Sequence, residues 1–302
     1  MTPNSAASTK MEGSNPRSAM LHELIEETRQ ICAGTLSRPE FRALAQRMAN
    51  EGHSEKEICS LVSIYEDEHP GGLQNLKASI SQTNSDYLFE RFVITLSALH
   101  SVDRIPECDV PLKTKQLICE SFQFIARPDQ GSIPFFKMGH GRFEAMCKTA
   151  SLLRYPAGQL DWEISGLPRS TFLYAPFQAT PRLMYFVAAK VGGFRPLMTS
   201  HLGVHRPSRY VLTAQNINKS YYSIANIMKS MPSIKGFYSI SWLFSPDTLR
   251  ISPHLDWMSK LFQENGGLVV RVGRADLDSG VFDRSPERKK AFEQGKFVPT
   301  EG

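Results

Sequence analysis

Two histidines, His201 and His205, stand four residues apart, a spacing that places both imidazoles on one face of a helix and that metal sites use. Gly203 lies between them and Pro207 follows, and both residues favour a strand or loop over a helix. No acidic residue stands in the relation to them that a zinc hydrolase requires. We therefore expect no metal at this pair.

A second metal-like pattern is the Glu-x-x-His spacing of Glu66 and His69, which di-iron proteins use on facing helices. Such centres need a second copy of the pattern, and the sequence contains none. Pro70 also ends the helix immediately. A histidine at the C-terminal end of a helix, where its charge is favourable, is the better interpretation, and we expect no metal cofactor.

The segment from Gly139 to Glu144 brings His140, Arg142 and Glu144 together at an expected helix N-terminus, with Cys147 a turn later. Glycines at a helix N-terminus can bind an anion, and a Cys–His pair can act as a nucleophile. His140 and Cys147 are seven residues apart, so they do not touch within one helix. Anion binding through Arg142 is therefore favoured over covalent catalysis.

Serine, histidine and aspartate also gather within residues 234–257. Ser241 and His254 would border one pocket if Ser241 lay on the open face of a strand and His254 at the next helix start. Asp247 and Asp256 would complete a Ser/His/Asp set, but the sequence lacks the Gly-x-Ser-x-Gly turn of serine hydrolases. Ser252, followed by proline, is better interpreted as a helix cap.

The first half of the chain has the 3.6-residue periodicity of amphipathic helices. Capping boxes precede two of them, and short connections favour an antiparallel bundle. Helices are expected over residues 19–32 (capped by Ser18), 37–50 (capped by Ser37), from Ser54 until Pro70-Gly-Gly72 stops it, over 86–100 (apolar on most sides) and over 112–126.

The second half alternates between helical and strand patterns, which indicates an α/β layer. The firmest strand expectation is residues 238–244, where Tyr238, Ile240, Trp242 and Phe244 share one side and serines the other. Other strands are expected at 160–164, 197–204 and 268–272, and helices at 143–153, 181–191, 218–231 and from 253 to about 264.

These patterns predict an α+β fold with a helical N-terminal half followed by a mixed α/β C-terminal domain. The Pro-rich piece 127–134 is the expected boundary. We divide the chain into a disordered leader (1–18), a helical region (19–130) and a mixed domain with a charged tail (131–302).

Composition and charge limit the classes of protein to which the chain can belong. The chain has no apolar run near the roughly 20 residues that cross a bilayer and no signal peptide, so we expect a cytoplasmic protein without a membrane partner. Its five cysteines are widely spaced, which argues against a disulfide framework. The net charge of +5 comes from dispersed residues, so no nucleic-acid partner is expected. The oligomeric state stays open.

The segment Leu202-Gly-Val-His-Arg-Pro-Ser-Arg209, the helix and strand after it, and the segment from Leu255 to Gly267 together resemble the second half of the GNAT acyltransferase superfamily. In that family a strand leads into a glycine-containing loop, whose backbone amides hold the acyl-CoA pyrophosphate at a helix start. The chain departs from the family pattern at Tyr210-Val-Leu-Thr213, which stand where the glycines are.

The resemblance implies group transfer from an acyl-CoA or acyl-carrier donor to a small-molecule substrate. Arg206 and Arg209 would then meet the anionic donor, His201 or His254 would act as general base, and Ser241 would line the pocket. The competing hypothesis is a non-catalytic interaction or regulatory protein that binds a partner through its helical half.

Overall fold

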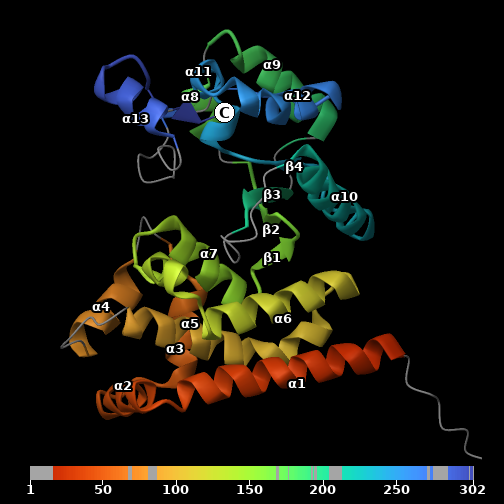
Figure 1. Cartoon of the computed structure of the whole chain (residues 1–302). Coiled ribbons are helices and arrows are strands. Elements are labelled where there is room, and N and C mark those ends of the chain that lie inside the picture. Colours follow the sequence, from red (N-terminus) through yellow and green to blue (C-terminus); the bar gives the residue numbers. More distant parts are fainter. Residues whose placement is uncertain are drawn as a thin grey trace, which may run out of the picture.

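The computed structural model describes residues 16–66, 70–80, 87–167, 170–175, 177–191, 193, 196–203, 213–270, 273–274, 285–298 and 300–301. Figure 1 shows a helical part, built from the first half of the chain, and a mixed part above it that contains a small sheet. The predicted α+β fold is confirmed. The predicted leader lies almost wholly outside the described residues.

The helical part contains seven α-helices and two short 3-10 helices among the described residues. These are α1 (Pro16–Leu36), α2 (Pro39–Asn50), α3 (Glu55–Ser63), α4 (Gly71–Ile80), α5 (Leu88–Ser101), η1 (Val102–Glu107), α6 (Leu112–Ala126), η2 (Gln130–Phe136) and α7 (Gly141–Ala150).

Local capping explains where several of these helices begin. Ser54 accepts a hydrogen bond from the backbone N–H of Glu57 at 3.2 Å, so the cap predicted for α3 is confirmed. The cap predicted at Ser37 is wrong, because its hydroxyl donates back to the carbonyl of Gly34 and Arg38 occupies the N-cap position of α2. The cap predicted at Ser18 is also wrong, because α1 already begins at Pro16.

The sequence pattern predicts no helix at α4, because Pro70-Gly-Gly72 is typical of a helix end. The helix forms because Leu73, Leu76 and Ile80 share one face and are buried in the core. Tertiary burial of an apolar face outweighs the roughly 1 kcal/mol that each glycine costs in a helix. Helix α3 ends at Ser63, before the stop expected at Pro70-Gly-Gly72, and the two glycines begin α4.

One hydrophobic core joins the helical part and extends from Ile25 to Leu152. Helix α5 lies at its centre, and ten of its residues are buried, as its nearly uniform apolar pattern predicted. The core includes Phe143 and Met146 of α7, so it continues beyond the boundary expected near residue 130. That boundary remains a prediction.

The sheet of the mixed part has the order β1-β2-β3-β4, with β1 (Arg154–Ala157), β2 (Leu160–Ser165), β3 (Leu197–Leu202) and β4 (Phe237–Tyr238). Strands β1, β2 and β3 pair antiparallel, whereas β3 and β4 are parallel, with Met198 opposite Phe237. The strand predicted at 160–164 is confirmed. The strand predicted at 197–204 is confirmed over residues 197–202, and Val204 lies outside the described residues. Helix α10 (Ala214–Ser230) forms the crossover between the parallel strands.

The strand predicted over residues 238–244 is wrong beyond Tyr238. Residues Trp242–Phe244 form a 3-10 turn, η5, and the hydroxyl of Ser241 accepts the backbone N–H of Leu243 at 3.2 Å. A serine hydroxyl that binds nearby backbone competes in this way with ladder hydrogen bonds. Helix α11 (Pro246–Ile251) follows.

The remaining elements lie around the far end of the sheet (Figure 1). They are α8 (Ser170–Tyr174), α9 (Thr180–Tyr185), the π-helical turn η3 (Phe186–Val191), η6 (Pro253–Leu255), α12 (Asp256–Glu264), β5 (Gly273–Arg274), α13 (Pro286–Glu293) and β6 (Thr300–Glu301). Residues 268–270, part of the strand predicted at 268–272, carry no regular secondary structure, and residues 271–272 lie outside the described residues.

Two further findings concern the part of the chain that the structure describes. None of its helices combines the length and apolar character required to span a bilayer. All five cysteines are free thiols, and burial raises the pKa of Cys59 and Cys119 to about 11. The thiols of Cys59 and Cys119 therefore remain protonated near neutral pH, and a protonated thiol is a poor nucleophile.

Candidate functional site

The two faces of the sheet differ sharply in chemistry. Alternate residues of a strand point to opposite faces, and cross-strand partners share a face. Leu160, Trp162 and Met198 pack with buried residues of α10. The opposite face, which we call the polar face, is formed by Arg154 of β1, Asp161, Glu163 and Ser165 of β2, Thr199 and His201 of β3, and Tyr238 of β4.

A charge cluster occupies the β1 end of the polar face, with Glu163 at its centre. Its carboxylate accepts from Arg154 Nε at 2.9 Å and from Lys148 Nζ of α7 at 3.3 Å. His201 Nε2 lies 3.5 Å from the same carboxylate, and Lys148 also pairs with Glu144 at 2.8 Å. One carboxylate therefore meets three nitrogen groups from β1, β3 and α7.

Burial and the neighbouring groups shift the pKa of Glu163 in opposite directions. Burial alone would raise its pKa, but the neighbouring His201 and the positive charge of Arg154 outweigh burial and hold the pKa of Glu163 well below its usual range. For His201, burial dominates and lowers the pKa, although Glu163 opposes that shift. Near neutral pH the cluster therefore pairs an ionised carboxylate with a neutral imidazole.

This arrangement defines what His201 can do. Nε2 lies 3.5 Å from the carboxylate of Glu163, outside hydrogen-bond geometry. A neutral ring that carries its proton on Nε2 turns an N–H toward that carboxylate and leaves the lone pair on Nδ1. An imidazole held in one tautomer by a carboxylate is the arrangement that general bases use. Glu163 is in this sense a positioning residue.

Hydroxyl groups continue the polar face toward β4. Ser165 Oγ lies 2.5 Å from Thr199 Oγ1 and 2.7 Å from Tyr238 Oη, and the Tyr238 hydroxyl donates to the carbonyl of Gly166 at 3.0 Å. Thr199 stands opposite Glu163 on β2 and next to Tyr238 on β4. The hydroxyls thus form a continuous polar strip from the charge cluster to the edge strand.

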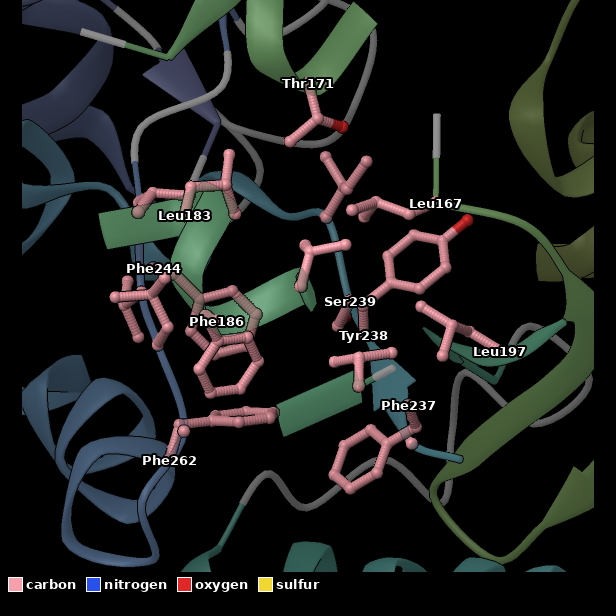
Figure 2. A pocket seen from close by; sticks show the side chains of 18 residues that line it. Leu167, Thr171, Leu183, Phe186, Leu197, Phe237, Tyr238, Ser239, Phe244 and Phe262 are labelled. Carbon is pink, nitrogen blue, oxygen red and sulfur yellow. The ribbon is translucent and has the colours of Figure 1, made fainter. Parts of the chain in front are cut away.

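At that edge the polar strip meets an apolar cavity of about 140 Å³, shown in Figure 2. Its lining combines one side of the α9–η3 helix, strand β4 and the segment that follows α12. The lining residues are Leu167, Thr171, Leu183, Phe186, Val187, Val191, Leu197, Gly236, Phe237, Tyr238, Ser239, Ile240, Phe244, Phe262, Gly267, Leu268, Val269 and Val270.

The two ends of the cavity differ. In Figure 2 the rings of Phe186, Phe244 and Phe262 gather at one end, while Tyr238 points its hydroxyl away from them. Phe244 and Phe262 pack edge to face with centroids 5.2 Å apart. A ligand that fits such a space has an apolar body and a polar group at the Tyr238 end.

The structure separates the predicted site residues. His201 lies on the polar face. Ser241 caps η5, and the cavity lining includes Ser239 instead. His254 is exposed on η6, and Arg142 at the start of α7 stacks its guanidinium 3.8 Å from the Phe135 ring. None of these four residues is among those described as lining the cavity.

Three predicted residues fall outside the described part of the chain: Arg206 and Arg209, expected to contact the donor, and His205, the second member of the histidine pair. Of Glu66 and His69, only Glu66 is described. Within the described ranges, no three or more His, Cys, Asp or Glu side chains are grouped to hold a metal ion.

Sequence reasoning missed the centre of the site, Glu163, and its partners Arg154 and Lys148. A signal was present in Leu160-Asp-Trp-Glu-Ile-Ser165, where the alternation places Asp161, Glu163 and Ser165 on one face of a short strand. The alternation of these polar residues with the buried Trp162 is typical of a strand that has one packed face and one polar face. The partners could not be inferred, because they depend on strand register and on how α7 packs.

The stability of the protein is expected to fall on acidification in two steps. His201 has a lower pKa in the folded chain, so the unfolded chain binds a proton first and stability falls below about pH 6.5. Glu163 has a depressed folded pKa, so its stabilisation is present above about pH 4.3 and is lost progressively below it. Urea unfolding followed by circular dichroism across this range measures both steps.

A His201→Gln variant provides the control for this pH dependence. It is expected to lose the upper step and to keep a smaller lower step, because Arg154 still lowers the pKa of Glu163. If the variant and the native chain lose stability in parallel between about pH 7 and 5, the assignment of the upper step to His201 is incorrect.

Comparisons with protein-family models, with curated proteins and with solved structures found no match for this chain.

Proposed function

We propose that this protein is a group-transfer enzyme that moves an acyl group from a thioester donor, acyl-CoA or an acyl carrier, to a nucleophilic acceptor. One observation carries the proposal: a half-buried histidine, His201, with the carboxylate of Glu163 beside it, and an apolar cavity lie along one polar strip of the sheet. An acyl thioester has matching chemistry, because a polar reactive carbonyl ends an apolar chain.

The order of elements supports the same proposal. The resemblance to GNAT acyltransferases implies a strand, a phosphate-binding loop, a helix, a second strand and a second helix. Strand β3, helix α10, strand β4 and helix α12 follow this order. Arg206 and Arg209 lie in the chain between β3 and α10, and the N-terminus of α10, capped by Thr213, favours an anion.

In the proposed reaction, the acyl chain occupies the cavity and the acceptor amine or hydroxyl approaches from the His201 end of the polar strip. The acceptor lone pair attacks the thioester carbonyl, and His201 Nδ1 takes the proton that the acceptor loses. The new bond to the acyl carbon replaces the carbon–sulfur bond, and the sulfur leaves as a thiolate that takes up a proton. Glu163 stabilises the imidazolium that forms.

The cavity assignment is tested by filling it. Val187 is buried and lines the cavity, so Val187→Phe is expected to weaken the binding of octanoyl-CoA at least tenfold in isothermal titration calorimetry. Binding of unacylated CoA should change little, because it leaves the cavity empty. Ala188→Phe is the matched control, since Ala188 is exposed on the same helical turn.

Equal weakening by the two substitutions, or no octanoyl-CoA binding by the native chain, would contradict this function. Stable co-purification of a partner protein through residues 19–126 would instead support the competing hypothesis of an interaction protein.

A further inference from the structure

Four large apolar side chains are exposed to solvent close to one another in sequence, at the outer surface of the mixed part. Leu173 of α8, Phe177 in the following turn, and Met184 and Tyr185 of α9 are 84%, 91%, 59% and 66% exposed. Helices α8 and α9 lie at the end of the molecule farthest from α1 (Figure 1). A single apolar side chain exposed on a protein surface is common and needs no explanation, but four large ones within a short segment do.

The helix formed by α9 and η3 is apolar on both sides. Leu183, Phe186 and Val187 line the cavity on its inner side. Its outer side presents Met184 and Tyr185 together with the exposed alanines 188 and 189. A helix in a water-soluble fold ordinarily places polar residues on its outer side.

The sequence segment that carries α8 and α9 has charge of one sign. Arg182 and Lys190 are exposed on the same helix. Between Glu163 and Asp247 the sequence contains no aspartate or glutamate and nine lysines and arginines. The whole chain has 30 aspartates and glutamates. The 83 consecutive positions without either residue are therefore a property of this segment and not of the overall composition. The region is therefore complementary to an anionic partner.

We propose that the exposed apolar residues of α8 and α9, flanked by Arg182 and Lys190, form a surface that binds anionic membranes peripherally. Aromatic and aliphatic side chains combined with cations, on a helix without acid, are the features of helices that lie in the membrane interface. A nucleic acid would be matched by the cations alone and would leave Leu173 and Met184 without a role. This inference goes beyond the proposed function and revises the expectation that no membrane takes part.

Co-sedimentation of the full chain with vesicles tests the proposal. The native chain is expected to bind vesicles of equal parts phosphatidylcholine and phosphatidylglycerol, and to bind pure phosphatidylcholine vesicles much more weakly. Arg182→Gln with Lys190→Gln should lower partitioning roughly thirtyfold, because each cation near such a surface contributes about a fivefold change. Leu173→Ser with Phe177→Ser should lower it at least tenfold.

Matched controls replace exposed residues elsewhere. Arg47→Gln with Lys113→Gln alters two exposed cations of the helical part, and Ile64→Ser alters an exposed aliphatic residue there. Both controls should bind like the native chain. The proposal is overturned if the native chain does not sediment with anionic vesicles, if the controls lose as much binding, or if Arg182 and Lys190 are required for binding duplex DNA instead of vesicles.

Discussion

Replacing His201 by glutamine is expected to slow acyl transfer by about 10²–10⁴-fold, the range that general-base residues contribute. The loss follows from the polar face, where His201 is the neutral side chain able to take a proton and Glu163 holds its Nε2 side. The release of free thiol from octanoyl-CoA in the presence of an amine acceptor measures the rate. Octanoyl-CoA affinity should change little, because His201 is not among the residues that line the cavity.

Two controls separate a chemical role of His201 from a structural one. His254→Gln changes an exposed histidine of η6 and should leave the rate unchanged. Glu163→Gln should lower the rate and also shift the acid limb of the pH–rate profile, because it removes the charge that opposes the loss of the His201 proton. An unaltered rate in His201→Gln, with folding intact by circular dichroism, would remove His201 from the mechanism.

Replacing Lys77 by methionine is expected to destabilise the helical part by about 3–5 kcal/mol. Lys77 Nζ of α4 lies 2.7 Å from Glu90 Oε1 of α5, and the Glu90 side chain is only 1% exposed. The second oxygen of Glu90 has no hydrogen-bond partner within the described part of the chain. Without Lys77, a buried carboxylate would lose the cation that offsets its desolvation.

The double variant Lys77→Met with Glu90→Leu is the informative control. Replacing both members of a buried ion pair by apolar residues is often neutral or stabilising, so most of the lost stability should return. Glu26→Ala removes a partner of the half-exposed Arg29 and should cost no more than about 1 kcal/mol. Urea unfolding midpoints measure all three variants, and equal losses in the single and double variants would contradict the interpretation.

The helices could largely be predicted, because their stability depends on patterns within one segment. Helix α6 occupies the predicted residues 112–126, since Pro111 fixes its start and apolar residues repeat at helical spacing. Strand β4 shows the limit of such patterns. Apolar residues and serines do alternate after Tyr238. The hydroxyl of Ser241, however, accepts the backbone N–H of Leu243, and the chain forms the turn η5 instead of a longer strand.

The candidate site was harder to predict, because its residues come together only through tertiary structure. The spacing of His201 from His205 gives no indication of the residues that surround His201 in the sheet. Its partner Glu163 lies 38 positions away in sequence and reaches it through the pairing of β2 with β3. The cavity depends on segments from Leu167 to Val270, so no local pattern describes it.

The measurement that tests the central claim most directly is the location of the acyl chain on the protein. Methyl-labelled protein with octanoyl-CoA should give nuclear Overhauser contacts from the chain to Leu183, Val187 and Val269, which line the cavity. These contacts should be absent in Val187→Phe and unchanged in Ala188→Phe. Contacts confined to the exposed surface of α8 and α9, or to the helical part, would contradict an acyl-binding cavity beside the polar face.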